Sequence, residues 1–203
     1  MGTLNELPAI NTPLAGGFYA GRINVDGVLY ALIVAPKADG EHADIAWNGS
    51  SKSVAGALSY CDGRANTNAM AEAGSKLAQW ALDLRIGGHD DWYLPSQDEL
   101  EVIYRTFKPT TEANWCYARS GINLSAEPPT RPYTPVFPLQ TVHEAFRDGG
   151  AEAFDDVWYW SSTQHASASD CAWGQGFDGG NQSFNREGNE FRARAVRRLP
   201  ISA

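Results

Sequence analysis

The sequence predicts an α+β domain in which two amphipathic helices flank small antiparallel β-sheets. Three observations predict this class: two β-rich runs near the N-terminus, two stretches of helical periodicity, and three short apolar or aromatic runs after Trp158. The runs after Trp158 are too short for helices, and the Gly, Asn, Ser and Asp between them favour turns. We therefore expect residues 158–199 to form an antiparallel meander.

The N-terminal region predicts an arm followed by a β-hairpin. Prolines and asparagines punctuate the first residues, so residues 1–15 are expected to form an arm and residues 16–203 a single domain. The runs 18–23 and 28–35 flank Asp26-Gly27, which is a strong hairpin signal. The second run is continuously apolar and should be a central strand, whereas the polar segment that follows, to Ser53, should be a loop.

Helical periodicity predicts the two main helices. Apolar residues recur at steps of three and four from Ala69 to Leu84, which predicts a helix from about residue 66 to residue 84, ended by Gly87-Gly88. Ser96 and Glu99 form a capping box, which predicts a second helix to about Phe107. The core is expected to contain Leu94, Trp160 and Val196.

Residues 108–140, here called the excursion, contain six prolines. A loop of this length inside a compact domain is uncommon and is usually functional. Thr141 and Glu144 form a second capping box, which predicts a short helix that ends before Gly149.

The composition disfavours several classes of partner. A formal net charge of −8 disfavours nucleic acids and anionic membranes, because both are polyanions. The chain has three cysteines, an odd number, at widely spaced positions: Cys61, Cys116 and Cys171. Neither a disulfide framework nor a zinc site is therefore indicated.

The first residues lack the basic and apolar regions of a secretory signal, and no apolar run is long enough for membrane insertion. We therefore expect no signal peptide, and a phage-encoded protein that is made and folded in a host cytoplasm or that becomes part of a virion.

Three motifs have both a functional and a structural interpretation. His89-Asp90-Asp91 offers metal ligands, but adjacent side chains of an extended segment point to opposite sides, and we favour a role in the local turn. Ser161-Ser162-Thr163 near His165 suggests a hydrolase, yet neighbouring residues rarely make a triad and no Gly-x-Ser-x-Gly elbow is present. Four arginines could bind an anion, but pairing with carboxylates is favoured in this acidic chain: Arg192, Arg194, Arg197 and Arg198.

Several motifs occur together: Gly16-Gly17-Phe18, Asp62-Gly63-x-x-Asn66-Thr67, Gly87-Gly88-x-Asp90-Asp91-Trp92-Tyr93-Leu94-Pro95-Ser96-x-x-Glu99-Leu100, Tyr159-Trp160-Ser161-Ser162-Thr163, Ala172-Trp173 and Arg194-Ala195-Val196-Arg197-Arg198. With these motifs, the chain from Gly16 onward resembles a family of bacterial and phage domains related to the C-terminal domain of the Legionella collagen-like adhesin. The resemblance implies a C-type-lectin-like fold in which the N- and C-terminal strands are adjacent.

The resemblance also implies a function in binding. We expect a non-enzymatic module, associated with a phage tail or a bacterial surface, that recognises a host-surface glycan or protein receptor and could be diversified by a retroelement. The alternatives are a structural or assembly protein of a virion, in contact with other tail proteins or in an oligomer, and a cysteine-dependent enzyme of the formylglycine-generating type. The chain lacks the Glu-Pro-Asn, Gln-Pro-Asp and Trp-Asn-Asp triplets of calcium-dependent lectins, so calcium is unsupported and no cofactor is expected.

The segment between residues 173 and 186 is the predicted ligand-facing surface. It combines aromatic side chains, which give rigid contact area, with amides, which give adaptable hydrogen bonds. One alternative stays open: Trp173 and Phe177 have equal parity on a strand and could both face the core. The predicted binding residues are Trp173, Gln175, Phe177, Asp178, Asn181, Gln182, Phe184, Asn185 and Arg186.

Overall fold

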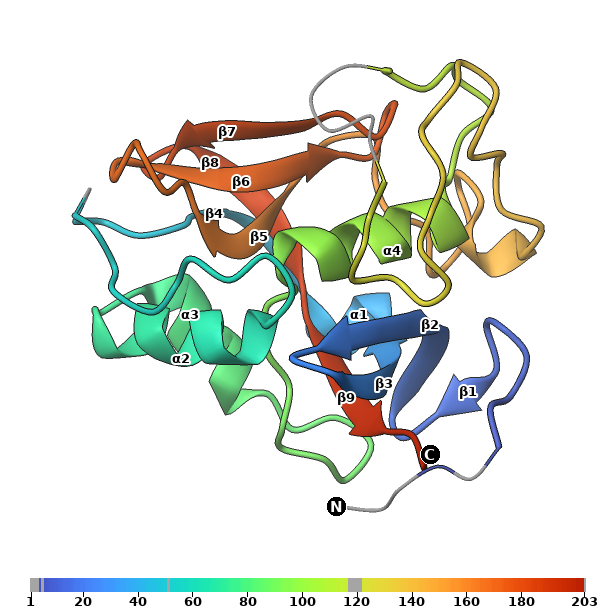
Figure 1. The fold of residues 1–203 in the computed structure, drawn as a ribbon, viewed down its shortest axis with the longest axis horizontal. Helices are drawn as coiled ribbons and strands as arrows, with labels where there is room; N and C mark the ends of the chain where they lie inside the picture. Colours follow the sequence, from blue (N-terminus) through green and yellow to red (C-terminus); the bar gives the residue numbers. More distant parts are fainter. Residues whose placement is uncertain (1–3, 5, 51, 117–121, 203) are drawn as a thin grey trace.

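A computed structural model describes the whole chain except residues 1–3, 5, 51, 117–121 and 203 (Figure 1). It confirms the α+β class. One sheet has the strand order β1-β2-β3-β9 and the other the order β4-β8-β5-β6-β7. The strands are β1 (Pro13–Leu14), β2 (Gly17–Val25), β3 (Val28–Val34), β4 (Glu41–Ala46), β5 (Trp158–Gln164), β6 (Cys171–Gly176), β7 (Gln182–Arg186), β8 (Glu190–Arg194) and β9 (Val196–Pro200).

Strands β2 and β3 form the predicted hairpin. Its turn places Asp26 at φ 50° and Gly27 at φ 84°, and two successive left-handed residues match the right-handed twist of the flanking strands. The β3 strand lies between β2 and β9, and its residues from Ala31 to Val34 are buried. The C-terminal strand therefore lies against the N-terminal hairpin, as expected.

The segment that follows β3 is not the predicted loop. A short helix, α1 (Lys37–Gly40), leads into β4, which pairs with β8 at the edge of the second sheet. Ala43 and Asp44 of this strand are exposed, so it does not bury the alternating apolar face that identifies a strand in the sequence. Pairing with β8 therefore decides the conformation of this segment.

The first predicted helix is two helices, α2 (Gly63–Glu72) and α3 (Lys76–Asp83). Gly74 breaks the helix at φ 90°, and Ser75 caps α3 by accepting a hydrogen bond from the Ala78 amide at 3.3 Å. Met70 and Leu77 are nevertheless buried in one cluster. The periodicity predicted the apolar face correctly but could not show the break.

The second predicted helix is α4 (Gln97–Phe107), with the Ser96 capping box formed as predicted. It contacts β2 of the first sheet and β5 and β6 of the second (Figure 1). Its polar first turn is buried, Glu99 included, as well as the expected apolar residues. Leu94, Trp160 and Val196 are also buried, which confirms their place in the core.

The described residues of the excursion contain no helix or strand, and its ends meet through the Thr141 amide, which donates to the Lys108 carbonyl at 2.9 Å. The helix that follows is a 3-10 turn, η1 (Glu144–Phe146), preceded by His143 without a side-chain cap. The prediction of a second capping box was therefore wrong. The Thr141 hydroxyl instead accepts from the His143 amide at 3.3 Å.

The predicted meander is present only in part. Strands β5, β6 and β7 are antiparallel neighbours, but the third predicted run divides into β8 and β9, which belong to different sheets. Ala195 separates the two strands; its amide donates to the Gly40 carbonyl at 2.8 Å, and its carbonyl accepts from the Ala35 amide at 3.0 Å. At Ala195 the chain thus passes from the second sheet into the first.

Candidate binding surface

Three of the nine predicted binding residues are buried, so they cannot face a ligand. Phe177 packs against the rings of Tyr104, Phe154 and Tyr159. The alternative in which this aromatic faces the core is therefore correct for Phe177. Gln175 and Gln182 are also buried.

The buried glutamines join the excursion to α4. The Gln182 amide nitrogen donates to the Gln175 side chain at 3.1 Å and to the Gln97 carbonyl at 2.9 Å. Gln175 in turn donates to the Tyr133 hydroxyl of the excursion at 3.3 Å. Amides that looked suited to a displayed surface are thus internal hydrogen-bonding groups.

A second group of predicted residues lies at the middle of the β6–β7 pair. Trp173 is half-buried and stands directly opposite Phe184, which is 47% exposed. The ring of His165 lies 5.4 Å from Trp173 and 4.3 Å from Phe184 between centroids. We call these three rings the aromatic cluster. Asn185 is half-buried and Arg186 exposed at the end of β7, and Asn181 is half-buried in the loop between the strands.

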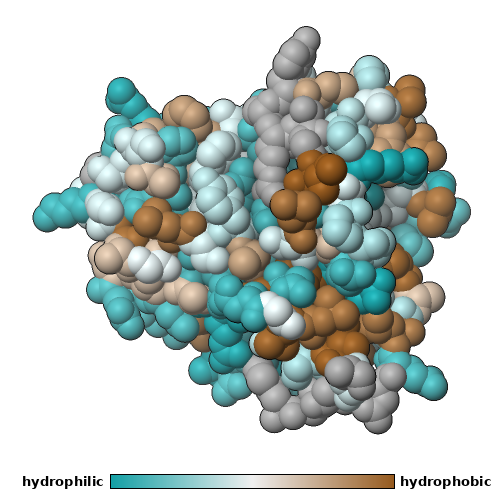
Figure 2. All heavy atoms as spheres, viewed as in Figure 1, coloured by the Kyte–Doolittle hydropathy of each residue, from teal (hydrophilic) through white to brown (hydrophobic). Residues whose placement is uncertain are grey.

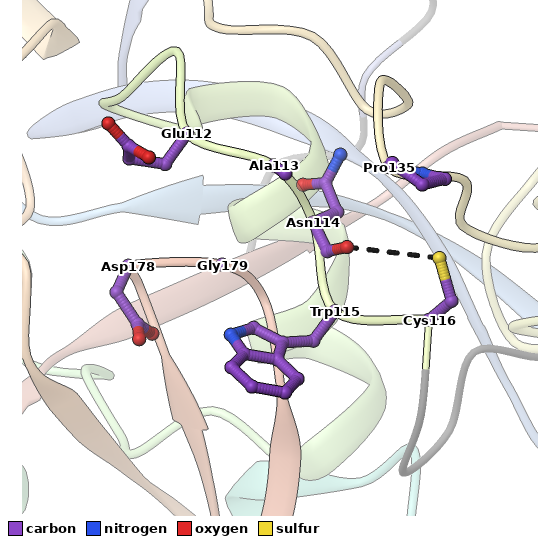
Figure 3. Close-up of a pocket in the computed structure, with 8 residues that line it drawn as sticks. All are labelled: Glu112, Ala113, Asn114, Trp115, Cys116, Pro135, Asp178 and Gly179. Atoms are coloured by element: carbon purple, nitrogen blue, oxygen red, sulfur yellow. Dashed lines mark hydrogen bonds between the residues drawn. The ribbon is translucent and has the colours of Figure 1, made fainter.

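Asp178, in the loop between β6 and β7, lines a different feature, which we call the main hollow. This hollow has a volume of about 460 Å³. Figure 3 shows that its walls come from the loop and from two limbs of the excursion. The lining residues are Glu112, Ala113, Asn114, Trp115, Cys116, Pro135, Asp178 and Gly179.

Backbone contacts hold the walls of the main hollow in place. The Trp115 amide donates to the Gly179 carbonyl at 2.9 Å. A Cβ atom at Gly179 would lie only 2.4 Å from Trp115 Cδ1, so the indole needs a glycine beneath it. The buried Asn114 side chain accepts from the Tyr104 hydroxyl at 2.7 Å and donates to the Pro138 carbonyl at 2.9 Å. Both limbs of the excursion are thereby fixed to α4.

A second hollow of about 420 Å³ shares Glu112, Ala113 and Pro135 with the first. Its other walls include the aliphatic side chains of Val136, Pro138 and Leu139, and Val136 and Leu139 are 72% and 70% exposed. Figure 2 shows hydrophobic side chains at several places on the face of the molecule that it views. The lining residues are Lys108, Thr111, Glu112, Ala113, Pro135, Val136, Pro138, Leu139 and Gln140.

Two carboxylates line the main hollow. Glu112 and Asp178 line it, and the pKa of the nearby Asp156 carboxyl is raised by partial desolvation and by the charges of Asp178, Asp148 and Glu112. Within the described ranges, none of these four carboxylates has an ion pair with a lysine or arginine. The buried Lys108 ammonium is bonded to the Glu112 backbone carbonyl. The described lining of the main hollow therefore has two acidic side chains and no lysine or arginine.

The hydroxyl motif of β5 is engaged in structural hydrogen bonds. Ser161, Ser162 and Thr163 donate to the carbonyls of Trp173, Pro95 and Ser59 at 2.8, 3.1 and 2.9 Å. None of these hydroxyls is hydrogen-bonded to the described His165 ring, which belongs to the aromatic cluster. Cys61, Cys116 and Cys171 are free and half-buried.

The C-terminal arginines have the predicted structural role. Each one pairs with a carboxylate: Arg192 with Glu41 and Asp155, Arg194 with Glu152, Arg197 with Asp91, and Arg198 with Asp62. The Arg197 guanidinium forms a two-pronged bond with Asp91 at 2.8 and 3.0 Å. Asp91 is thus an ion-pair partner rather than a group that satisfies the turn. Among the described residues, no group of three or more His, Cys, Asp or Glu side chains could hold a metal ion.

None of the helices in the described ranges has the length and hydrophobicity that a membrane span requires. No curated protein matches the chain. Residues 38–197, from α1 into β9, match the model of a family described as the Lcl C-terminal domain. This match covers both main helical regions, the excursion and the whole second sheet. The chain therefore belongs to the Lcl C-terminal domain family, as its motifs indicated.

Proposed function

We propose that this chain is a non-enzymatic binding module whose contact surface consists of the main hollow, the second hollow and the exposed apolar side chains between them. One observation carries the proposal: exposed apolar residues gather on the excursion beside two hollows, around the 53% exposed Trp115. Concave apolar surfaces with a few fixed polar groups are typical of binding sites. Membership of the Lcl C-terminal domain family supports an adhesin-like role.

The receptor in this proposal is a glycan or protein on a host-cell surface. Two features support a C-type-lectin-like description of the fold: β9 pairs with the N-terminal hairpin, and a long excursion is inserted between α4 and the second sheet. The structural hydrogen bonds of the β5 hydroxyls support binding rather than catalysis.

The test compares three variants for retention on whole bacterial cells and on glycan and protein arrays. Trp115→Ala with Leu139→Ala removes apolar contact area from the proposed surface and should abolish retention. Phe184→Ala tests the aromatic cluster as a rival surface. Leu58→Ala, which removes a 43% exposed side chain elsewhere, is the matched control.

The proposal holds if only the double variant loses retention while its melting temperature stays close to that of the parent. Loss in the Phe184 variant alone would assign recognition to the aromatic cluster. Retention in all three variants would reject both surfaces.

A further inference from the structure

Resting on the proposed function, we propose that the two hollows bind a basic segment of a partner protein. A lysine or arginine of this segment occupies the main hollow, between Trp115 and the carboxylates of Glu112 and Asp178, and an adjacent apolar side chain occupies the second hollow.

The charge of the main hollow selects a cation. Glu112 and Asp178 line it, and both side chains are exposed. Partial desolvation and the charges of Asp178, Asp148 and Glu112 act together on the Asp156 carboxyl, whose pKa they raise. No lysine or arginine in the described part of the chain forms an ion pair with them. An anionic ligand would be repelled here, and the net charge of −8 would slow its approach further.

Trp115 supplies the second contact for a cation. About half of its surface is exposed, and its ring rests on Gly179. Figure 3 shows the indole, Glu112 and Asp178 arranged around the same opening. An ammonium or guanidinium over an indole face is attracted by the ring quadrupole. Because the ring is already held by the backbone of Gly179, little ordering is required when the ligand binds.

The second hollow favours a peptide over other amine-bearing ligands. It shares Glu112, Ala113 and Pro135 with the main hollow, and its aliphatic walls include the exposed Val136 and Leu139. An amino sugar could occupy the acidic hollow but would leave these apolar walls uncovered. A peptide can present a basic and an apolar side chain at neighbouring positions and so cover both.

The chain does not offer this basic segment at its own C-terminal strands, because the arginines there are already paired. Arg194 and Arg197 are buried with Glu152 and Asp91, and Arg192 and Arg198 also have carboxylate partners. The β8 and β9 strands of a second copy are therefore excluded as the occupant, and the proposal commits to a segment of a different protein.

Isothermal titration with short synthetic peptides tests the inference. A peptide of alternating lysine and leucine should bind, whereas the same peptide with acetylated lysines should bind about tenfold more weakly or not at all. Replacing both lining carboxylates, by Glu112→Gln with Asp178→Asn, should weaken the lysine–leucine peptide by about tenfold. The control, Glu72→Gln with Asp90→Asn, removes two exposed acidic groups that line neither hollow and should change the affinity by less than about twofold.

Three results would overturn the inference: equal binding of the acetylated peptide, equal losses in the two double variants, or tighter binding of a glucosamine oligomer than of the lysine–leucine peptide. The last result would identify an amino sugar as the ligand. Cellular retention separates this inference from the proposed function. If the Trp115/Leu139 variant loses retention but the Glu112/Asp178 variant does not, the proposed contact surface is supported. The basic segment is then rejected as its ligand.

Discussion

The buried Trp160 side chain connects three neighbouring strands of the second sheet, β4, β8 and β5. Trp160 of β5 is fully buried, packs against the tilted ring of Phe191 of β8 at 4.4 Å between centroids, and donates its indole N–H to the Ile45 carbonyl of β4 at 2.9 Å. One residue thus satisfies a hydrogen bond and fills space between three strands.

Trp160→Ala should therefore lower the free energy of unfolding by about 3–5 kcal/mol, because it leaves a large cavity and an unpaired carbonyl. Urea denaturation of the purified protein measures this change. Phe184→Ala removes an aromatic that is 47% exposed and should cost less than about 1 kcal/mol. Similar losses in both variants would contradict the burial of Trp160.

Glu187 shows the opposite case, a buried carboxyl that is incompletely paired. One oxygen accepts from the Gln164 amide at 2.6 Å, and the other has no partner among the described residues. Burial raises the pKa of this carboxyl above its ordinary value of 4.5. At pH values between the pKa of the unfolded state and the raised pKa of the folded state, the folded state retains a proton that the unfolded state has released. The free energy of unfolding therefore falls as pH rises through this window.

Glu187→Gln should consequently raise the melting temperature at about pH 7.5, because the amide keeps the bond from Gln164 without a buried charge. The advantage over the parent should disappear below about pH 4, where the carboxyl is protonated in both states. Thermal unfolding across this pH range measures the difference. A stabilisation that is independent of pH would show that ionisation of Glu187 is not its cause.

At the scale of elements, the break between α2 and α3 depends on the backbone of one residue. Gly74 adopts φ 90°, yet a Cβ atom there would meet nothing within 4 Å. Space therefore permits a side chain, while the left-handed conformation disfavours one.

Gly74→Ala should cost about 1–2 kcal/mol through this conformational penalty alone. Gly49→Ala is the matched control, because its Cβ atom also has open space and its φ lies outside the left-handed region. Equilibrium unfolding of both variants gives the comparison. If both changes are neutral, the residue at position 74 tolerates the conformation and the helix break has another cause.

At the scale of the whole molecule, buried amides fix the excursion to the rest of the chain. Gln182 accepts a bond from Gln97 of α4 at 3.2 Å and donates to Gln175, which reaches Tyr133. The excursion, which supplies two walls of the main hollow, is therefore hydrogen-bonded through Tyr133 to this buried network.

Gln182→Ala should lower the free energy of unfolding by about 1–3 kcal/mol, since it leaves the Gln97 and Gln175 amides without this partner. Hydrogen exchange at the Trp115 amide, which donates to Gly179, should accelerate as the excursion loosens. Gln79→Ala on α3 is the control, because this exposed amide bonds only Asp83 among the described residues. An unchanged exchange rate at the Trp115 amide would show that the buried amides do not hold the excursion in place.

The sequence by itself determined the features that depend on neighbouring residues. Asp26-Gly27 specifies the hairpin turn because both residues tolerate positive φ, and Ser96 with Glu99 specifies the start of α4 because each satisfies the other's backbone. The same motif failed at Thr141, where no regular helix follows to supply the amides that a cap requires.

Only the tertiary structure decided which side chains face solvent and which segments meet. Gln175 and Gln182 have the composition of a displayed loop, but α4 and the excursion cover them. Asp178 was predicted as a contact residue, yet the residue that completes its hollow, Trp115, comes from the excursion and was missed. The six prolines indicated that this segment was unusual, but its place against the β6–β7 loop depends on contacts between distant residues, which periodicity and local turn signals do not record.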